Sequence, residues 1–204
     1  MADITTIFFD MGSVLLNVDE KGALARMGKR ISRSPDDILA ALDEAGLLDK
    51  LGRGEITPDE FFAKAAALLG VSTAVTPGEM KDIWRSMLTP KPEIVKLASS
   101  LKGKYRLFLL SNTDSVHHAH AATIIPLDKI FEGQVVSYLV GAEKPSERIY
   151  HIALDMAREK AEKCVFIDDL PKNVEAARAV GIHGIVFKDS EQLRRDLAKL
   201  GVKA

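Results

Sequence analysis

The first apolar stretch of the chain is short and continuous. Ile7, Phe8 and Phe9 follow one another, and Asp10 comes directly after them. The run is too short for a buried helix, and a continuous apolar run is typical of a strand that is covered on both faces of a parallel sheet. The pattern therefore predicts a buried strand that ends at a carboxylate.

Helical patterns dominate from Asn17 to Thr89, with no convincing strand between them. Three of the expected helices begin with Ser or Thr followed by Pro, with an acidic residue three positions after the Ser or Thr, which is a typical helix start. We expect Trp84, Phe61 and Phe62 to fill the common core of four short helices rather than to contact a ligand. The predicted starts are at Lys21, Ser34, Thr57 and Thr76.

Strands and helices alternate from Pro90 onwards, as in right-handed crossover units. We therefore predict the α/β fold class, with a Rossmann-like parallel sheet core, helices on both faces and an inserted four-helix cap. The core comprises 1–16 and 90–204, and the cap comprises 17–89. The later strands are expected at 106–110, 134–137, 163–167 and 184–187, and the helices at 93–101, from 114, at 146–159, 173–180 and 190–200.

Composition narrows the range of partners. The chain has 28 Lys and Arg against 29 Asp and Glu, so no overall field attracts nucleic acid or an anionic membrane. Cys164 is the single cysteine, which excludes an internal disulfide and favours a buried thiol in a reducing compartment. The start of the chain lacks a targeting pattern, and no apolar run reaches membrane-spanning length. We expect a soluble cytoplasmic protein, either monomer or homodimer.

Polar residues follow the predicted strands where each strand ends. They are Asp10, then Ser111 and Asn112, then Lys144, then the pair 168–169, which is Asp-Asp. In a parallel sheet these ends converge, and ligands bind there. Three crowded carboxylates repel one another, so a divalent cation is expected, and Mg²⁺ suits an all-oxygen site.

The same residues suit phosphoryl transfer. Lys144 and the donors around Ser111 and Asn112 match a phosphate group, which leaves Asp10 free to attack phosphorus. We infer transfer of a phosphoryl group from a small metabolite to Asp10, followed by hydrolysis of the aspartyl phosphate.

These motifs resemble those of the haloacid dehalogenase-like (HAD-like) superfamily, in the phosphatases with a helical cap after the first strand. The matching residues are Asp10, Ser-Asn-Thr at 111–113, Lys-Pro at 144–145 and Asp-Asp at 168–169, and the likeness covers essentially the whole chain. The resemblance implies a Mg²⁺-dependent aspartyl-phosphate mechanism, with the Gly12 carbonyl as a metal ligand. Of the acidic pair, Asp169 is the first choice for direct ligation and Asp168 the second.

One position departs from the family pattern. Related phosphatases have a general acid two residues after the nucleophile, where this chain has Gly12. An anomeric oxygen leaves more readily than an ordinary alcohol and depends less on that acid. The variant also resembles a bacterial branch that includes an α-glucose-1-phosphate phosphatase, and His117 matches a His of that branch. We hypothesise a sugar 1-phosphate, such as a hexose 1-phosphate, as substrate.

Three other interpretations were weighed. A 2-haloacid dehalogenase also lacks the second Asp, but it does not need the pair Asp168 and Asp169. A receiver-like phosphoacceptor has the motifs in a different order. A non-catalytic phosphate-binding HAD-like protein is favoured by Gly12 and disfavoured by the retention of the other groups. We keep His117 as a candidate substrate contact or substitute proton donor. The region Lys172-Asn173 is expected to support the residues around the metal.

Overall fold

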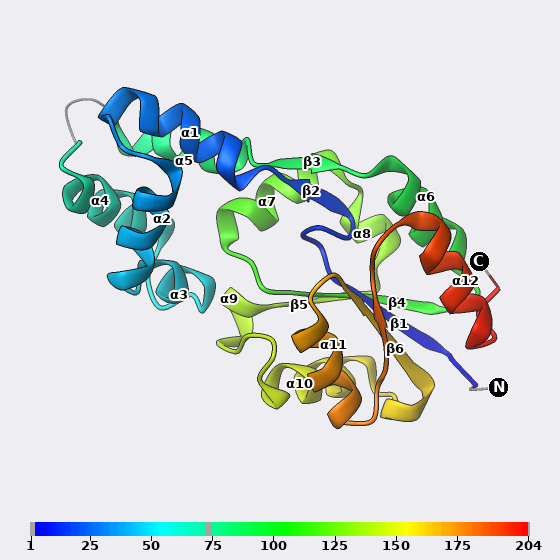
Figure 1. Cartoon of the computed structure of the whole chain (residues 1–204). Coiled ribbons are helices and arrows are strands. Elements are labelled where there is room, and N and C mark those ends of the chain that lie inside the picture. Colours follow the sequence, from blue (N-terminus) through cyan, green and yellow to red (C-terminus); the bar gives the residue numbers. More distant parts are fainter. Residues whose placement is uncertain (1–2, 72–74, 204) are drawn as a thin grey trace.

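The computed structural model describes residues 3–71 and 75–203. Residues 1–2, 72–74 and 204, which belong to the predicted core and cap ranges, lie outside the described residues. Figure 1 shows a helical unit at one end of the molecule and an α/β unit at the other, with both chain ends on the side of the α/β unit away from the helical one.

The α/β unit is built on a five-stranded parallel sheet in the order β5-β4-β1-β6-β7, which confirms the predicted fold class. The central strand β1 lies between β4 and β6, so Phe8 pairs in register with Phe108 and Phe166. Asp10, which follows β1, is thereby flanked by the ends of β4 and β6. The strands are β1 (Thr6–Phe9), β4 (Arg106–Ser111), β5 (Gly133–Val136), β6 (Cys164–Asp168) and β7 (His183–Val186).

Helices cover both faces of the sheet (Figure 1). Alternate strand residues point to opposite faces: Ile7 and Phe9 pack on one side and Phe8 on the other. Cys164 is fully buried on the second side, where its Sγ donates to the Lys160 carbonyl at 3.3 Å. The first face carries α6 (Pro92–Leu101), α7 (Ser115–Ile124), α8 (Leu127–Ile130) and α12 (Ser190–Lys199), and the second carries α10 (Glu147–Ala157) and α11 (Pro171–Ala179).

The helical unit, which we call the cap, contains five described helices rather than the expected four. The added helix starts after Gly46, whose left-handed φ of 63° separates it from the previous helix. It has six residues, which are too few to show a helical period in the sequence. Phe61, Phe62 and Trp84 are buried together, as predicted. The cap helices are α1 (Glu20–Ile31), α2 (Pro35–Glu44), α3 (Leu47–Gly52), α4 (Pro58–Leu69) and α5 (Pro77–Arg85).

A two-stranded antiparallel ribbon joins the two units. It pairs β2 (Leu16–Val18) with β3 (Leu88–Pro90), and neither strand was expected, because three residues are too few for a pattern. We propose this ribbon as the junction between core and cap. The expected strand end at Ser137 is wrong, since Ser137 begins the short helix α9 (Ser137–Val140), and the 3₁₀ turn η1 (Ala161–Lys163) was also not expected. None of the helices in the described part of the chain has the length and apolar character needed to cross a bilayer.

Candidate active site

A buried lysine joins two strand ends at the centre of the sheet. Lys144 Nζ lies 2.8 Å from Asp10 Oδ1 and 2.6 Å from Asp168 Oδ2. The side chains of Lys144 and Asp168 are almost fully buried, and that of Asp10 is 10% exposed. The Asp10 carboxylate is therefore slightly exposed to solvent, while Lys144 fixes its position from the buried side. We call Asp10, Lys144, Asp168 and Asp169 the floor of the site.

The two adjacent aspartates at the end of β6 differ in their surroundings. Asp168 accepts from Lys144, from the Leu170 backbone N–H at 2.8 Å and from Asn173 Nδ2 at 3.1 Å, so its oxygens are committed to holding the floor. Asp169 is only partly buried and accepts a hydrogen bond from Ser13. Asp169 is thus the freer of the two to bind a ligand.

The charges of the floor act on one another because water is excluded. Burial raises the pKa of Asp10 to about 6, and repulsion from Asp168 adds to this against the attraction of Lys144. Burial alone would lower the pKa of Lys144, but the two carboxylates outweigh it and raise that pKa above its usual value. Burial also raises the pKa of Asp169.

The floor fits a hard divalent cation. Asp10, Asp168 and Asp169 each offer a carboxylate oxygen within 4.8 Å of the others. One lysine only partly offsets three carboxylates that burial and mutual repulsion penalise, and oxygen ligands of this kind are those that Mg²⁺ prefers. Asp10 and Asp169 are the side chains best placed to ligate it, with Asp168 behind them.

Gly12 has space around it. Its carbonyl oxygen accepts from the Val14 N–H at 2.6 Å and keeps a second lone pair for the predicted ligand role. A Cβ placed on Gly12 would meet its nearest neighbour, Val18 Cγ2, at 3.6 Å, which is ordinary contact. The absent acid therefore leaves free space beside Asp10 rather than a filled position.

The segment after β4 supports the lysine. Asn112 Nδ2 donates to the Lys144 carbonyl at 2.9 Å, and Asn112 Oδ1 accepts from the Lys144 N–H at 2.8 Å. This amide thus anchors the backbone that carries Lys144, a role the sequence did not indicate. Ser111 is buried at the end of β4, where its hydroxyl makes a long contact of 3.5 Å to the Asn112 carbonyl and no other hydrogen bond among the described residues.

A cleft of about 320 Å³ opens under the cap beside the floor, and its described lining includes Gly12, two residues after Asp10, and Glu143, directly before Lys144, but not the four floor residues themselves. On the core side it is lined by residues after β1 and β4, including Gly12 and Asn112, and by Glu143. The opposite side is largely apolar and comes from the cap and the ribbon. We call this side the roof, and its lining residues are Val18, Glu20, Leu48, Leu51, Trp84 and Met87.

One link between cap and core joins Trp84 to α7, the helix that follows β4 and Asn112. Trp84 Nε1 donates to Asp114 Oδ2 at 2.9 Å, and its indole stacks on the ring of His117 with 5.1 Å between centroids. Asp114 also caps α7, accepting from the N–H groups of Val116 and His117. Although burial raises the pKa of Asp114, the hydrogen bonds from His117 and Trp84 hold it below its usual value.

His117 borders the cleft with both ring nitrogens engaged. Nδ1 lies 3.0 Å from Asp114 Oδ2 and Nε2 lies 2.8 Å from the Trp84 carbonyl. These contacts make it part of the link between the units, and its predicted role toward substrate stays a prediction. His118 instead contacts Tyr138 and Gln134, and His120 contacts Thr123, so the three histidines share no site.

A second link meets the same segment of the core. Ser137 Oγ accepts from the Thr113 N–H at 2.9 Å and lies 2.7 Å from the carbonyl of Gly52, at the end of α3 in the cap. Both links therefore end on the neighbouring residues Thr113 and Asp114. Sequence reasoning missed Asp114 and Ser137, and of the two only Asp114 had a signal, as the polar residue before a predicted helix.

The chain as a whole matches a known family. A model described as haloacid dehalogenase-like hydrolase matches residues 4–181. The chain therefore belongs to the HAD-like hydrolases, in agreement with its sequence motifs, and is an enzyme of that class.

Two of the relatives that it matches over nearly their full length are named as phosphatases. It is 24% identical over 202 residues to a D-ribitol-5-phosphate phosphatase from Bacteroides thetaiotaomicron, a match that covers 95% of this chain and 97% of that protein. It is 25% identical over 197 residues to a sesquiterpene phosphatase from Aspergillus oryzae, with 94% of each chain covered.

Solved structures agree with the fold. A HAD family enzyme from Bacteroides thetaiotaomicron, in complex with magnesium and inorganic phosphate, superposes with a TM-score of 0.82 at 25% identity, covering 91% of this chain and 94% of that one. A HAD-like family hydrolase from Porphyromonas gingivalis gives a TM-score of 0.82 at 29% identity and covers both chains completely.

Proposed function

We propose that this protein is a Mg²⁺-dependent phosphatase that hydrolyses a small phosphorylated metabolite, a sugar phosphate such as a hexose 1-phosphate. The observation that carries the proposal is Asp10 at the centre of the floor, held by Lys144 beside Asp168 and Asp169. The phosphatase names of the full-length relatives, and the magnesium and phosphate bound to a neighbour of the same fold, support it.

The reaction follows from the position of Asp10. A carboxylate oxygen of Asp10 attacks phosphorus, a new O–P bond forms, and the bond from phosphorus to the leaving oxygen breaks with its electron pair on that oxygen. The leaving oxygen takes a proton from solvent, because Gly12 offers none. Water then attacks the aspartyl phosphate at phosphorus, which releases inorganic phosphate and regenerates Asp10.

The other groups of the floor prepare this attack. Lys144 orients Asp10 through its 2.8 Å contact and places a positive charge beside the growing negative charge on the phosphoryl oxygens. In this proposal Ser111 donates to the phosphate oxygens, and Asn112 contributes by holding the backbone of Lys144 beside them. Asp10, the Gly12 carbonyl and Asp169, backed by Asp168, would hold Mg²⁺, which supplies charge neutralisation for the phosphate when bound.

The proposed substrate class follows from the absence of a general acid at Gly12. General acid catalysis contributes typically about a hundred- to ten-thousandfold in rate. Without it, an alkoxide leaves slowly, whereas the anomeric oxygen of a sugar 1-phosphate is a better leaving group. Gly12 therefore favours a hexose 1-phosphate over a primary alkyl phosphate.

Phosphate release from glucose 1-phosphate, glucose 6-phosphate and nucleotides tests the proposal, with Mg²⁺ or with a chelator. We expect glucose 1-phosphate to be preferred and the chelator to abolish turnover. Asp10→Asn should lose about a thousandfold or more in kcat, because an amide is a poor nucleophile toward phosphorus. Asp155→Asn on the exposed side of α10 is the matched control and should keep full activity. Equal turnover by Asp10→Asn would refute the mechanism.

A further inference from the structure

The roof of the cleft has an uneven composition. Val18, Leu48, Leu51 and Met87 present apolar side chains, and no Lys or Arg is among the described residues that line the cleft. The pocket can therefore contact the carbon skeleton of a leaving group, but it has no guanidinium or ammonium group aimed at a second anion.

Two carboxylates lie among these apolar side chains. Glu20, at the first turn of α1, and Glu143, next to Lys144, both line the cleft. In the described part of the chain Glu20 has no hydrogen bond or ion pair, so its charge faces the cleft uncompensated. Asp114 is a third carboxylate at the cleft, but it already accepts a hydrogen bond from Trp84 and contacts the His117 ring.

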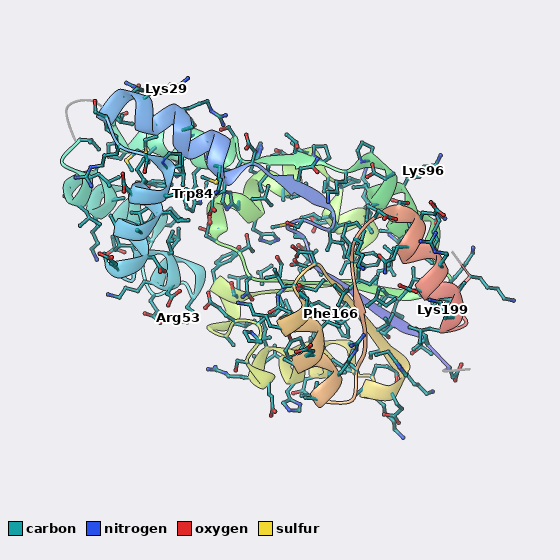
Figure 2. All side chains as sticks on the ribbon, viewed as in Figure 1. Lys29, Arg53, Trp84, Lys96, Phe166 and Lys199 are labelled. Carbon is teal, nitrogen blue, oxygen red and sulfur yellow. The ribbon has the colours of Figure 1, made fainter. Side chains whose placement is uncertain are left out.

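The nearest arginine does not reverse this balance. Arg53, at the end of α3 (Figure 2), lies 3.8 Å from Glu143, 2.7 Å from Glu55 and 3.6 Å from Asp49. One guanidinium is thus shared among three carboxylates, and the group as a whole remains negative. Burial raises the pKa of Glu143 despite the opposing attraction of Arg53. An anion in the cleft close to Glu143 therefore meets a carboxylate whose charge Arg53 only partly offsets.

We infer that the cleft selects phosphate monoesters whose leaving group carries no second anionic group, and that Glu20 and Glu143 enforce this selection. The inference rests on the proposed phosphatase function and narrows its substrate class. The phosphate that reacts is met by Lys144 at the floor, whereas a carboxylate or second phosphate under the roof would meet like charge in a partly dry pocket. Hydroxyl groups, by contrast, donate to both glutamates, and the C–H faces of a sugar or polyol pack on the apolar side chains.

A matched pair of substrates tests the inference directly. Glucose 1-phosphate and glucuronic acid 1-phosphate share the ring and the leaving oxygen and differ in a CH₂OH or a carboxylate at C6. We expect kcat/KM to favour the neutral member by about tenfold or more, mainly through KM, because like charges a few ångströms apart repel appreciably even at a protein surface. The preference should shrink at high ionic strength, where exposed charges are screened.

Variants assign the preference to residues. Glu20→Gln and Glu143→Gln keep shape and hydrogen bonding while removing charge, so each should reduce the preference by lowering KM for the glucuronic acid ester, and the double variant should reduce it further. Glu191→Gln on α12, which lies on the far side of the core from the cap (Figure 1), should leave both substrates unaffected.

The outcomes separate the inference from the function beneath it. If both esters are hydrolysed equally well, or if the two glutamine variants keep the parent preference, the inference is wrong and the phosphatase proposal stands. If neither ester nor any other phosphate monoester is hydrolysed with Mg²⁺, both fail together.

Discussion

The floor and the roof of the cleft differ in how far their polar groups are satisfied. In the floor, Lys144 bridges Asp10 and Asp168, and Asp168 receives further hydrogen bonds from Leu170 and Asn173. In the roof, apolar side chains dominate, and the carboxylate of Glu20 has no partner in the described structure. The floor is a preorganised network of paired charges, whereas the roof is an apolar surface that carries one unpaired carboxylate, that of Glu20, in the described structure.

This difference suits the floor to the chemical step and the roof to discrimination between substrates. Preorganised charges stabilise a transition state because they do not have to reorient when the charge moves. An apolar wall with a few polar groups instead discriminates between leaving groups by shape and charge. Changes in the floor should therefore alter kcat for every substrate, and changes in the roof should alter KM for some substrates only.

Replacing the bridging lysine should have the largest effect. Lys144→Met keeps much of the side-chain length and removes the charge that orients Asp10. We expect kcat to fall by about a hundredfold or more for every ester, because a preorganised charge at the reacting group is lost. Lys96→Met, which replaces an exposed lysine on α6, is the control. Steady-state kinetics on two chemically unlike esters tests this prediction. A loss of kcat for only one of them would mean that Lys144 acts in substrate selection and not in the chemical step.

Restoring the acid at the border between floor and roof should have an intermediate effect. The free space at Gly12 admits a side chain, and Gly12→Asp would place a proton donor beside the leaving oxygen. We expect kcat/KM for glycerol 3-phosphate to rise by about tenfold, less than the roughly hundredfold or more of a general acid that its surroundings position. For p-nitrophenyl phosphate, whose leaving group needs no proton, little should change.

Gly12→Asn provides the matched control for this gain, since it has the same shape without an acidic proton. A rise of equal size in both variants would mean that space filling, not proton donation, is responsible. A loss of activity in Gly12→Asp alone would point to repulsion from the floor carboxylates.

Loosening the link between cap and core should have the smallest effect. Trp84→Phe keeps an aromatic ring and removes the N–H that donates to the buried carboxylate of Asp114. A hydrogen bond to a charged group is worth about 1.5 to 3 kcal/mol, so we expect the free energy of unfolding to fall by about that amount. KM for a sugar phosphate should rise a few-fold with little change in kcat.

Urea denaturation and kinetics on the same samples measure both effects. Phe61→Leu, which disturbs the cap core beside Trp84 without touching Asp114, should lower stability and leave KM unchanged. If the two variants shift KM alike, the hydrogen bond has no special role in positioning the roof.

Much of the fold and the floor could be predicted from the sequence because their signals are local. The central strands β1, β4 and β6 contain continuous apolar runs, and parallel pairing brings the residues after them together whatever the intervening segments do. Asp10, Lys144, Asp168 and Asp169 are therefore predicted from their positions, and in the structure Lys144 contacts Asp10 and Asp168 while the three carboxylates lie within 4.8 Å of one another.

The remainder depends on contacts between distant segments. The strands β2 and β3 and the helix α3 are too short for periodicity. Asn112 was expected at the phosphate, yet its amide binds the backbone of Lys144, 32 residues away in the sequence. The links from Trp84 to Asp114 and from Gly52 to Ser137 join cap and core, and no local pattern encodes such pairings.

Both of those links end on adjacent residues, Thr113 and Asp114, directly after the segment expected to receive the phosphate. A tilt of the helical unit about its ribbon would pull on this one dipeptide from two sides and so disturb the neighbouring Asn112 and the backbone of Lys144 that Asn112 holds. Binding of a substrate beneath the helices would in this way be mechanically coupled to the alignment of Asp10, so that a poorly fitting ester would be penalised in its reaction rate as well as in its binding.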